Sequence, residues 1–96
     1  MPEHYYGFID WESDIRQPAL RKAKADGKSE AYEIAAMASH VVRLAASDSS
    51  DGKIKLSMRN TRSGQHPSHV LMMDLRRIAS EHTASNGEAC DLKFEY

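Results

Sequence analysis

Two segments of the chain alternate between apolar and polar residues, and each predicts a strand with one buried and one solvated face. They cover residues 53–59 and residues 90–96. The apolar positions are Ile54, Leu56 and Met58 in the first segment, and Cys90, Leu92, Phe94 and Tyr96 in the second. A third strand is predicted over residues 3–11, where aromatic and β-branched residues are concentrated. Its apolar residues fall on both parities, so it offers side chains to both faces of a sheet.

Three other segments carry helix signals. A short helix starts near Pro18 and ends at Gly27, and a longer one starts at Ser29 as N-cap. The apolar stripe of the longer helix is Ile34, Met37, Ala38, Val41, Leu44 and Ala45, and its solvated side is Glu33, His40, Arg43 and Ser47. The third helix starts at Pro67 and Ser68 and is expected to end at Asn86 and Gly87. Its stripe is Leu71, Leu75, Ile78, Ala79 and His82.

The resulting order, β-α-α-β-α-β, predicts a single α+β domain over residues 1–96. Two consecutive helices reverse the chain twice, so the second strand is expected to run opposite to the first. The single helix between the second and third strands makes those two parallel. Because the last two strands each have one polar face, all helices are expected to cover the other face. The predicted architecture is a two-layer sandwich with a three-stranded mixed sheet.

Composition narrows the class of protein. The chain is 41% hydrophobic and 28% charged, which is typical of a folded domain and too apolar for a disordered segment. Thirteen basic and fourteen acidic residues give a net charge of −1, so no global attraction to nucleic acid or membranes is expected. No uncharged stretch, residues 34–42 among them, is long enough to span a membrane. No secretory signal precedes the first strand, and a cytoplasmic protein is predicted.

Motifs that carry catalytic chemistry are missing from the sequence. It contains no phosphate-binding loop, dinucleotide fingerprint, nucleophile elbow or zinc-protease helix. His66 and His69 have a spacing that can place two imidazoles on one helical face, but further metal ligands at suitable spacing are lacking. The lone Cys90 has the parity of a small buried hydrophobe. We therefore expect no catalytic residues, no metal site and no cofactor, and a protein that is not an enzyme.

A basic segment offers one candidate binding surface. Residues 53–77 contain six Lys or Arg residues and a single acid, Asp74. A loop inside this segment runs from the second strand into a helix N-terminus, where free N–H groups and the helix dipole favour anions. The candidate residues for binding an anion or nucleic acid are Lys53, Lys55, Arg59, Arg62 and His66.

The aromatic first strand offers the other candidate surface. Four of the seven aromatic residues fall within the first eleven positions. If helices cover one face of the sheet, either Tyr5, Ile9 and Trp11 or Tyr6 and Phe8 must face outward. We select Tyr5, Ile9 and Trp11 as candidate partner-binding residues, with nearby acids as a polar rim, because Tyr and Trp are enriched at binding hot spots. The alternative is that other segments fold over these residues and make them part of the core.

Two functions follow from these surfaces. The first is a small non-enzymatic interaction module, of adaptor or inhibitor type, that binds a macromolecular partner through the aromatic strand or a free sheet edge. Its expected partner is a protein, with a homodimer as a further candidate, and no membrane. The alternative is a nucleic-acid-binding domain that uses the open sheet face and the basic residues 53–66.

Overall fold

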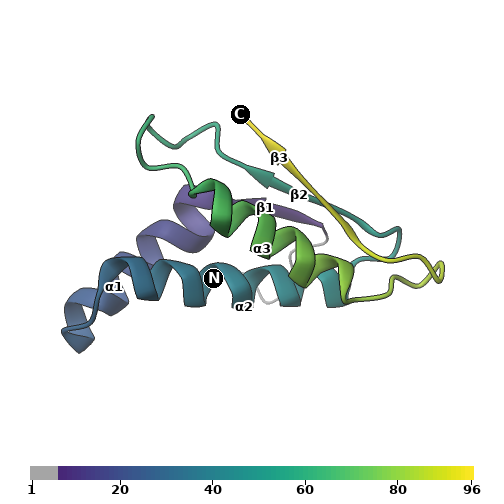
Figure 1. Ribbon diagram of the computed structural model, residues 1–96, viewed down its shortest axis with the longest axis horizontal. Helices are drawn as coiled ribbons and strands as arrows, with labels where there is room; N and C mark the ends of the chain where they lie inside the picture. Colours follow the sequence, from purple (N-terminus) through teal and green to yellow (C-terminus); the bar gives the residue numbers. More distant parts are fainter. Residues whose placement is uncertain (1–6) are drawn as a thin grey trace.

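The computed structural model describes residues 7–96, so Tyr5 and the start of the predicted first strand lie outside the described residues. Within them the protein is a small α+β domain (Figure 1). The strands are β1 (Phe8–Asp10), β2 (Lys53–Ser57) and β3 (Asp91–Glu95). The helices are α1 (Gln17–Asp26), α2 (Glu30–Asp48) and α3 (His69–Ser80), and a π-helical segment, η1 (Trp11–Arg16), joins β1 to α1.

The sheet has the strand order β1-β2-β3, and both neighbouring pairs are parallel. The prediction of a mixed sheet is therefore wrong. The two helices after β1 do not both cross the sheet: η1 and α1 carry the chain beyond its end, and only α2 returns along it (Figure 1). With nineteen residues, α2 is about 28 Å long, enough to bring the chain back to the start of β2.

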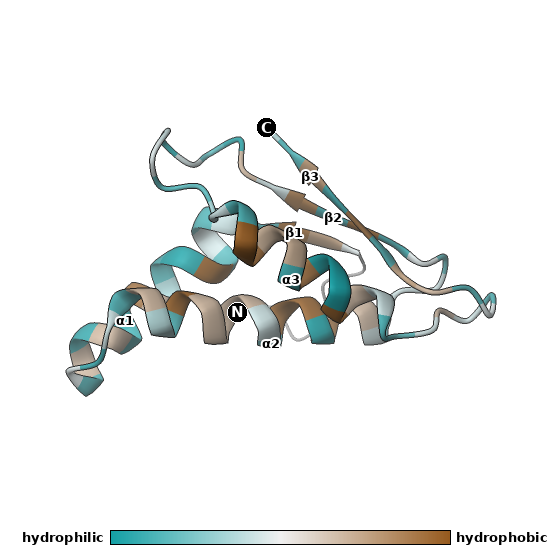
Figure 2. Ribbon diagram, in the orientation of Figure 1, coloured by the Kyte–Doolittle hydropathy of each residue, from teal (hydrophilic) through white to brown (hydrophobic). Residues whose placement is uncertain are grey.

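The sheet has one covered and one uncovered face. Crossovers between parallel strands share one hand, so two steps in the same direction, from β1 to β2 to β3, place α2 and α3 on the same side. The inward-facing Ile9, Ile54, Leu56 and Leu92 are buried. On the opposite face, Phe8 and Lys55 are exposed. Figure 2 shows hydrophobic residues on the strands and on the helices that cover them.

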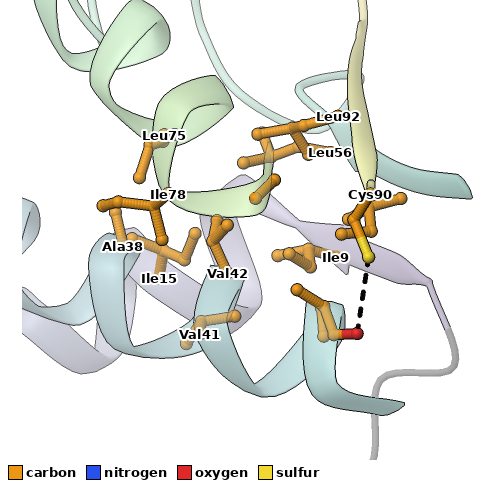
Figure 3. Close-up of a cluster of buried hydrophobic side chains, with 14 of the residues drawn as sticks. Ile9, Ile15, Ala38, Val41, Val42, Leu56, Leu75, Ile78, Cys90 and Leu92 are labelled. Carbon is orange, nitrogen blue, oxygen red and sulfur yellow. Dashed lines mark hydrogen bonds between the residues drawn. The ribbon is translucent and has the colours of Figure 1, made fainter. Parts of the chain in front are cut away.

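The core lies between the sheet and the helices, where side chains from α2, α3 and the three strands point toward one another (Figure 3). Leu75 and Ile78 of α3 join Leu56 and Leu92 in one cluster, as the predicted stripe of the third helix requires, but His82, also assigned to that stripe, lies beyond the end of α3. Cys90 is buried in the same cluster, as its parity predicts, and its Sγ donates to the Ala46 carbonyl oxygen at 3.7 Å.

The helix boundaries follow local capping chemistry, with one exception. Gly27 closes α1 in a left-handed conformation with φ 66°, and the Ser29 and Ser68 side chains cap α2 and α3 as predicted. The expected end of the third helix at Asn86 and Gly87 is wrong, because α3 ends at Ser80. Asn-Gly is also the signature of a tight hairpin turn, and here it lies in the turn that leads into β3.

One residue of α2 departs from the predicted helix faces. Glu33, expected on the solvated side, is buried. The reason is tertiary: α1 folds back along the first turns of α2 and covers a side that an isolated amphipathic helix would expose to water.

Candidate interaction surfaces

The aromatic first strand does not present its predicted binding residues. Ile9 is 0% and Trp11 1% exposed, so the prediction that they form an outward-facing surface is wrong. Ile9 occupies the face of β1 that the helices cover, because both crossovers lie on that side. Their partner Tyr5 lies outside the described residues.

Trp11 follows β1 directly and has the parity of the inward-facing Ile9, on the side that the helices cover. Asp10 acts as N-cap of η1, since its Oδ2 accepts from the Ser13 backbone N–H at 2.9 Å. Asp14 in turn accepts from the Asp10 N–H at 2.8 Å. The indole lies in the core cluster, and its Nε1 donates to the Gln65 carbonyl oxygen at 2.9 Å. Asp10 and Asp14, two of the acids expected to form a polar rim around Trp11, therefore stabilise the start of η1 instead.

The uncovered face of the sheet carries a different aromatic residue. Phe8, 53% exposed, pairs in register with Lys55, which pairs with Lys93 of β3. Lys53 lies beside Asp91 in a neighbouring row. Glu95 balances part of this positive charge: its carboxylate lies 3.5 Å from Lys55 Nζ and 3.9 Å from an Arg59 guanidinium nitrogen.

The five basic candidates divide between two places in the fold. Lys53 and Lys55 lie on the uncovered face, whereas Arg62 and His66 belong to the loop between β2 and α3, at the carboxyl edge of the parallel strands. His66 is half-buried, with Nε2 3.1 Å from the Thr61 carbonyl oxygen. Arg59 lies between the two groups. The structure therefore does not gather these residues into one site.

A cleft of about 440 Å³ opens at this carboxyl edge, between α1, the start of α2 and the β2–α3 loop. Several of its polar groups have partners within the fold. The Arg16 guanidinium lies 2.5 Å from the Glu12 carboxylate, and Ser68 Oγ accepts from the Leu71 N–H. The remaining lining includes the apolar side chains of Ile34, Leu71 and Trp11. Among the described residues, no hydrogen bond joins a nucleophile to a base in this lining.

The outer edge of β3 is half covered. The Asp91 N–H donates to the Gly52 carbonyl oxygen and Glu95 accepts from the Met58 N–H, both at 2.7 Å, so the odd-numbered residues face β2. The even-numbered residues therefore turn their backbone groups outward. The Cys90 N–H is taken by the His82 carbonyl oxygen at 3.0 Å, and Ala89 forms an antiparallel bridge with Thr83.

Arg76 covers the next outward-facing group. Its Nε donates to the Leu92 carbonyl oxygen at 3.4 Å, and its guanidinium lies 5.0 Å from the centre of the Phe94 ring. Beyond this point, in the part of the chain that the structure describes, no hydrogen bond reaches the outward backbone groups of Phe94. We call residues 92–96 the open edge.

Exposed apolar side chains border the open edge. Tyr96 is 69% exposed, its hydroxyl lies 3.8 Å from the Met72 sulfur, and its ring packs against His66 at 5.6 Å between centroids. Met72 of α3, which this hydroxyl contacts, is half-buried. Sequence reasoning placed Phe94 and Tyr96 on the apolar side of a strand but did not identify them as a surface. The position of β3 at an edge depends on strand order, which local sequence does not encode.

The described residues contain neither a candidate metal cluster nor a candidate membrane span. Among residues 7–96, no cluster of three or more His, Cys, Asp or Glu side chains could hold a metal ion. None of the helices in this range is long and apolar enough to cross a membrane.

Comparison with known proteins adds no relative: no protein-family model, curated protein or solved structure matches this chain.

Proposed function

We propose that this chain is a small protein-binding module that accepts a β-strand from a partner at the open edge. The observation that carries the proposal is the unequal covering of this edge. Residues 82–84 pair with residues 88–90 just before β3, and Arg76 covers the Leu92 carbonyl oxygen, whereas the outward backbone groups of Phe94 are bare among the described residues. Folded proteins normally shield their sheet edges, because unpaired N–H and C=O groups attract other strands. A half-shielded edge is a suitable template for one short added strand.

The side chains around the open edge fit that role. Backbone hydrogen bonds would supply affinity, and alternate side chains of the added strand would supply specificity. One row of its side chains would meet Tyr96 and Met72 of α3, and the other would meet Lys93 and Glu95 on the uncovered face. Aromatic and methionine side chains are enriched at such interfaces.

The alternative function, nucleic-acid binding on the uncovered face, has one observation in its favour. Phe8 is exposed in the same row as Lys55 and Lys93, and an aromatic ring flanked by cations can stack a base and contact phosphates. Against it, Asp91 lies on that face and Glu95 pairs with both Lys55 and Arg59. The charge there is too nearly balanced to favour a phosphate backbone, so strand addition remains the better-supported function.

A backbone modification tests the proposal without changing any side chain. The only cysteine, Cys90, allows the chain to be joined by ligation from residues 1–89 and a synthetic peptide of residues 90–96. An N-methyl group on Phe94 removes an outward-facing donor and blocks the edge sterically, while the bonds to β2 remain. The probe is a library of random extended peptides, selected for binding to the unmethylated ligated chain.

Selected peptides are expected to shift the amide NMR signals of residues 92–96 and to bind the N-methyl-Phe94 chain at least about tenfold more weakly. N-methylation of Lys93 is the matched control for backbone parity, because its N–H faces β2 and its loss should destabilise the fold itself. Peptides whose signals map elsewhere, or a selection that yields none, would contradict the proposal. Tight binding of a single-stranded oligothymidine that is lost on Lys55→Ala with Lys93→Ala would support the alternative instead.

A further inference from the structure

The open edge carries side chains that match a second copy of itself. Asp91, Lys93 and Glu95 alternate in charge along the uncovered face. A twofold axis perpendicular to the sheet would place two β3 strands side by side and antiparallel, with both helical layers on the same side. Side chains of directly opposed residues then share a face, and the outward-facing even-numbered residues must form the hydrogen-bonded pairs. The pairing can be centred on Leu92, Lys93 or Phe94.

Two of these registers are disfavoured, the first by a hydrogen bond that already exists and the second by like charges. Centring on Leu92 opposes Phe94 to Cys90 of the second copy, but the Cys90 N–H is already bonded to the His82 carbonyl oxygen. Centring on Lys93 opposes that lysine to itself and Asp91 to Glu95. Like charges directly opposite each other destabilise a strand pair.

The third register leaves the hydrogen bond of the Cys90 N–H intact and opposes no like charges. Centring on Phe94 opposes the two Phe94 residues, brings Leu92 opposite Tyr96, and brings Lys93 opposite Glu95 twice. These lysine–glutamate pairs are non-hydrogen-bonded pairs, where side chains of antiparallel strands approach most closely. Within the described residues, Lys93 has no acidic group within 4 Å, so it is available for a partner across the axis.

We propose that the occupant of the open edge is a second copy of this chain, paired antiparallel about Phe94 into a continuous six-stranded sheet. This inference rests on the proposed function and names its partner. Pairing of Leu92 with Tyr96 displaces Arg76 from the Leu92 carbonyl oxygen, where its hydrogen bond is long at 3.4 Å. The short pairing and this displacement make the dimer weak and rapidly exchanging. The net charge of −1 opposes self-association little.

Charge exchange across the axis identifies the register. In Lys93→Glu, position 93 repels Glu95 of the second copy, and in Glu95→Lys, position 95 repels Lys93. Each variant alone should dimerise about tenfold more weakly than the unmodified chain, as measured by sedimentation equilibrium over a concentration series. An equimolar mixture of the two variants restores both opposite-charge pairs in the heterodimer and should associate nearly as well as the unmodified chain.

Further variants separate charge, edge and folding effects. Lys53→Glu makes the same charge change on the uncovered face away from the open edge and should leave dimerisation unchanged. N-methylation of Phe94 should abolish dimerisation. Far-UV circular dichroism of every variant checks the fold, because Glu95→Lys also loses the ion pairs with Lys55 and Arg59.

Three results overturn the inference. A monomer at every concentration excludes a second copy, while the peptide selection above still decides strand addition separately. A dimer that survives N-methylation of Phe94 forms elsewhere on the molecule. A Glu95→Lys chain that dimerises more tightly by itself indicates the Lys93-centred register, because Asp91 then faces a lysine at position 95.

Discussion

Replacing Trp11 by alanine tests whether the sole tryptophan holds the core together or serves a surface. The indole is 1% exposed, and it belongs to the cluster that joins the sheet to the helices. Its Nε1 also donates to the Gln65 carbonyl oxygen, which ties the β2–α3 loop to η1. The substitution therefore removes core packing and one long-range hydrogen bond together.

The expected loss of unfolding free energy for Trp11→Ala is about 3–5 kcal/mol, the usual cost of truncating a large buried aromatic side chain. The hydrogen bond adds little, about 1 kcal/mol, because Gln65 is exposed and its carbonyl oxygen can bond to water instead. A domain of this length has a total stability of about 5–14 kcal/mol, so the variant loses a large fraction of it. Trp11→Phe keeps an aromatic ring and should cost distinctly less.

Urea titration followed by far-UV circular dichroism measures both losses without depending on tryptophan emission. In the unmodified monomer, tryptophan emission should be blue-shifted and protected from quenchers, because the indole is out of water. A loss below about 1 kcal/mol for Trp11→Ala, or red-shifted and quenchable emission, would refute the assignment of Trp11 to the core.

Three further substitutions test other parts of the structure. Leu75→Ala, at a fully buried position of α3, should cost about 2–5 kcal/mol in the same titration; a near-neutral result would mean that α3 presents another face to the sheet. Gly7→Ala should destabilise by more than about 1 kcal/mol, because Gly7 has φ +84° and an added Cβ would lie 2.5 Å from the Lys53 carbonyl oxygen. Burial, and secondarily Asp51, raises the pKa of the Cys90 thiol, so the unfolded chain loses this proton first and stability should fall as pH rises above 9.0. Cys90→Ala should lack this part of the fall, and the folded thiol should react slowly with Ellman's reagent at pH 8.

Local sequence signals correctly predicted the elements whose formation depends on nearby residues. Ser29 and Ser68 cap the two longer helices because their hydroxyls accept from backbone N–H groups three residues later. Gly27 ends α1 because glycine adopts the left-handed conformation without a steric penalty. The alternation around Leu56 and Leu92 likewise predicted the buried face of each strand, since side chains of a strand alternate between its two sides.

Features that depend on distant segments could not be derived in this way. The direction of β2 relative to β1 depends on whether α1 crosses the sheet or continues beyond it, and a helix of ten residues can do either. The burial of Ile9 and Trp11, which share a parity, depends on which face of β1 the helices cover. In both cases the local pattern fits two structures, and packing against other elements selects one of them.

The candidate site shows the same division. The alternation of charge at Asp91, Lys93 and Glu95 is present in the sequence, and so is the apolar parity of Phe94. Whether those residues lie inside the sheet or at its edge is a property of strand order, and strand order results from the crossovers that α2 and α3 make. An edge exists only where a neighbouring strand is missing, so tertiary structure alone determines which backbone groups remain available for a partner.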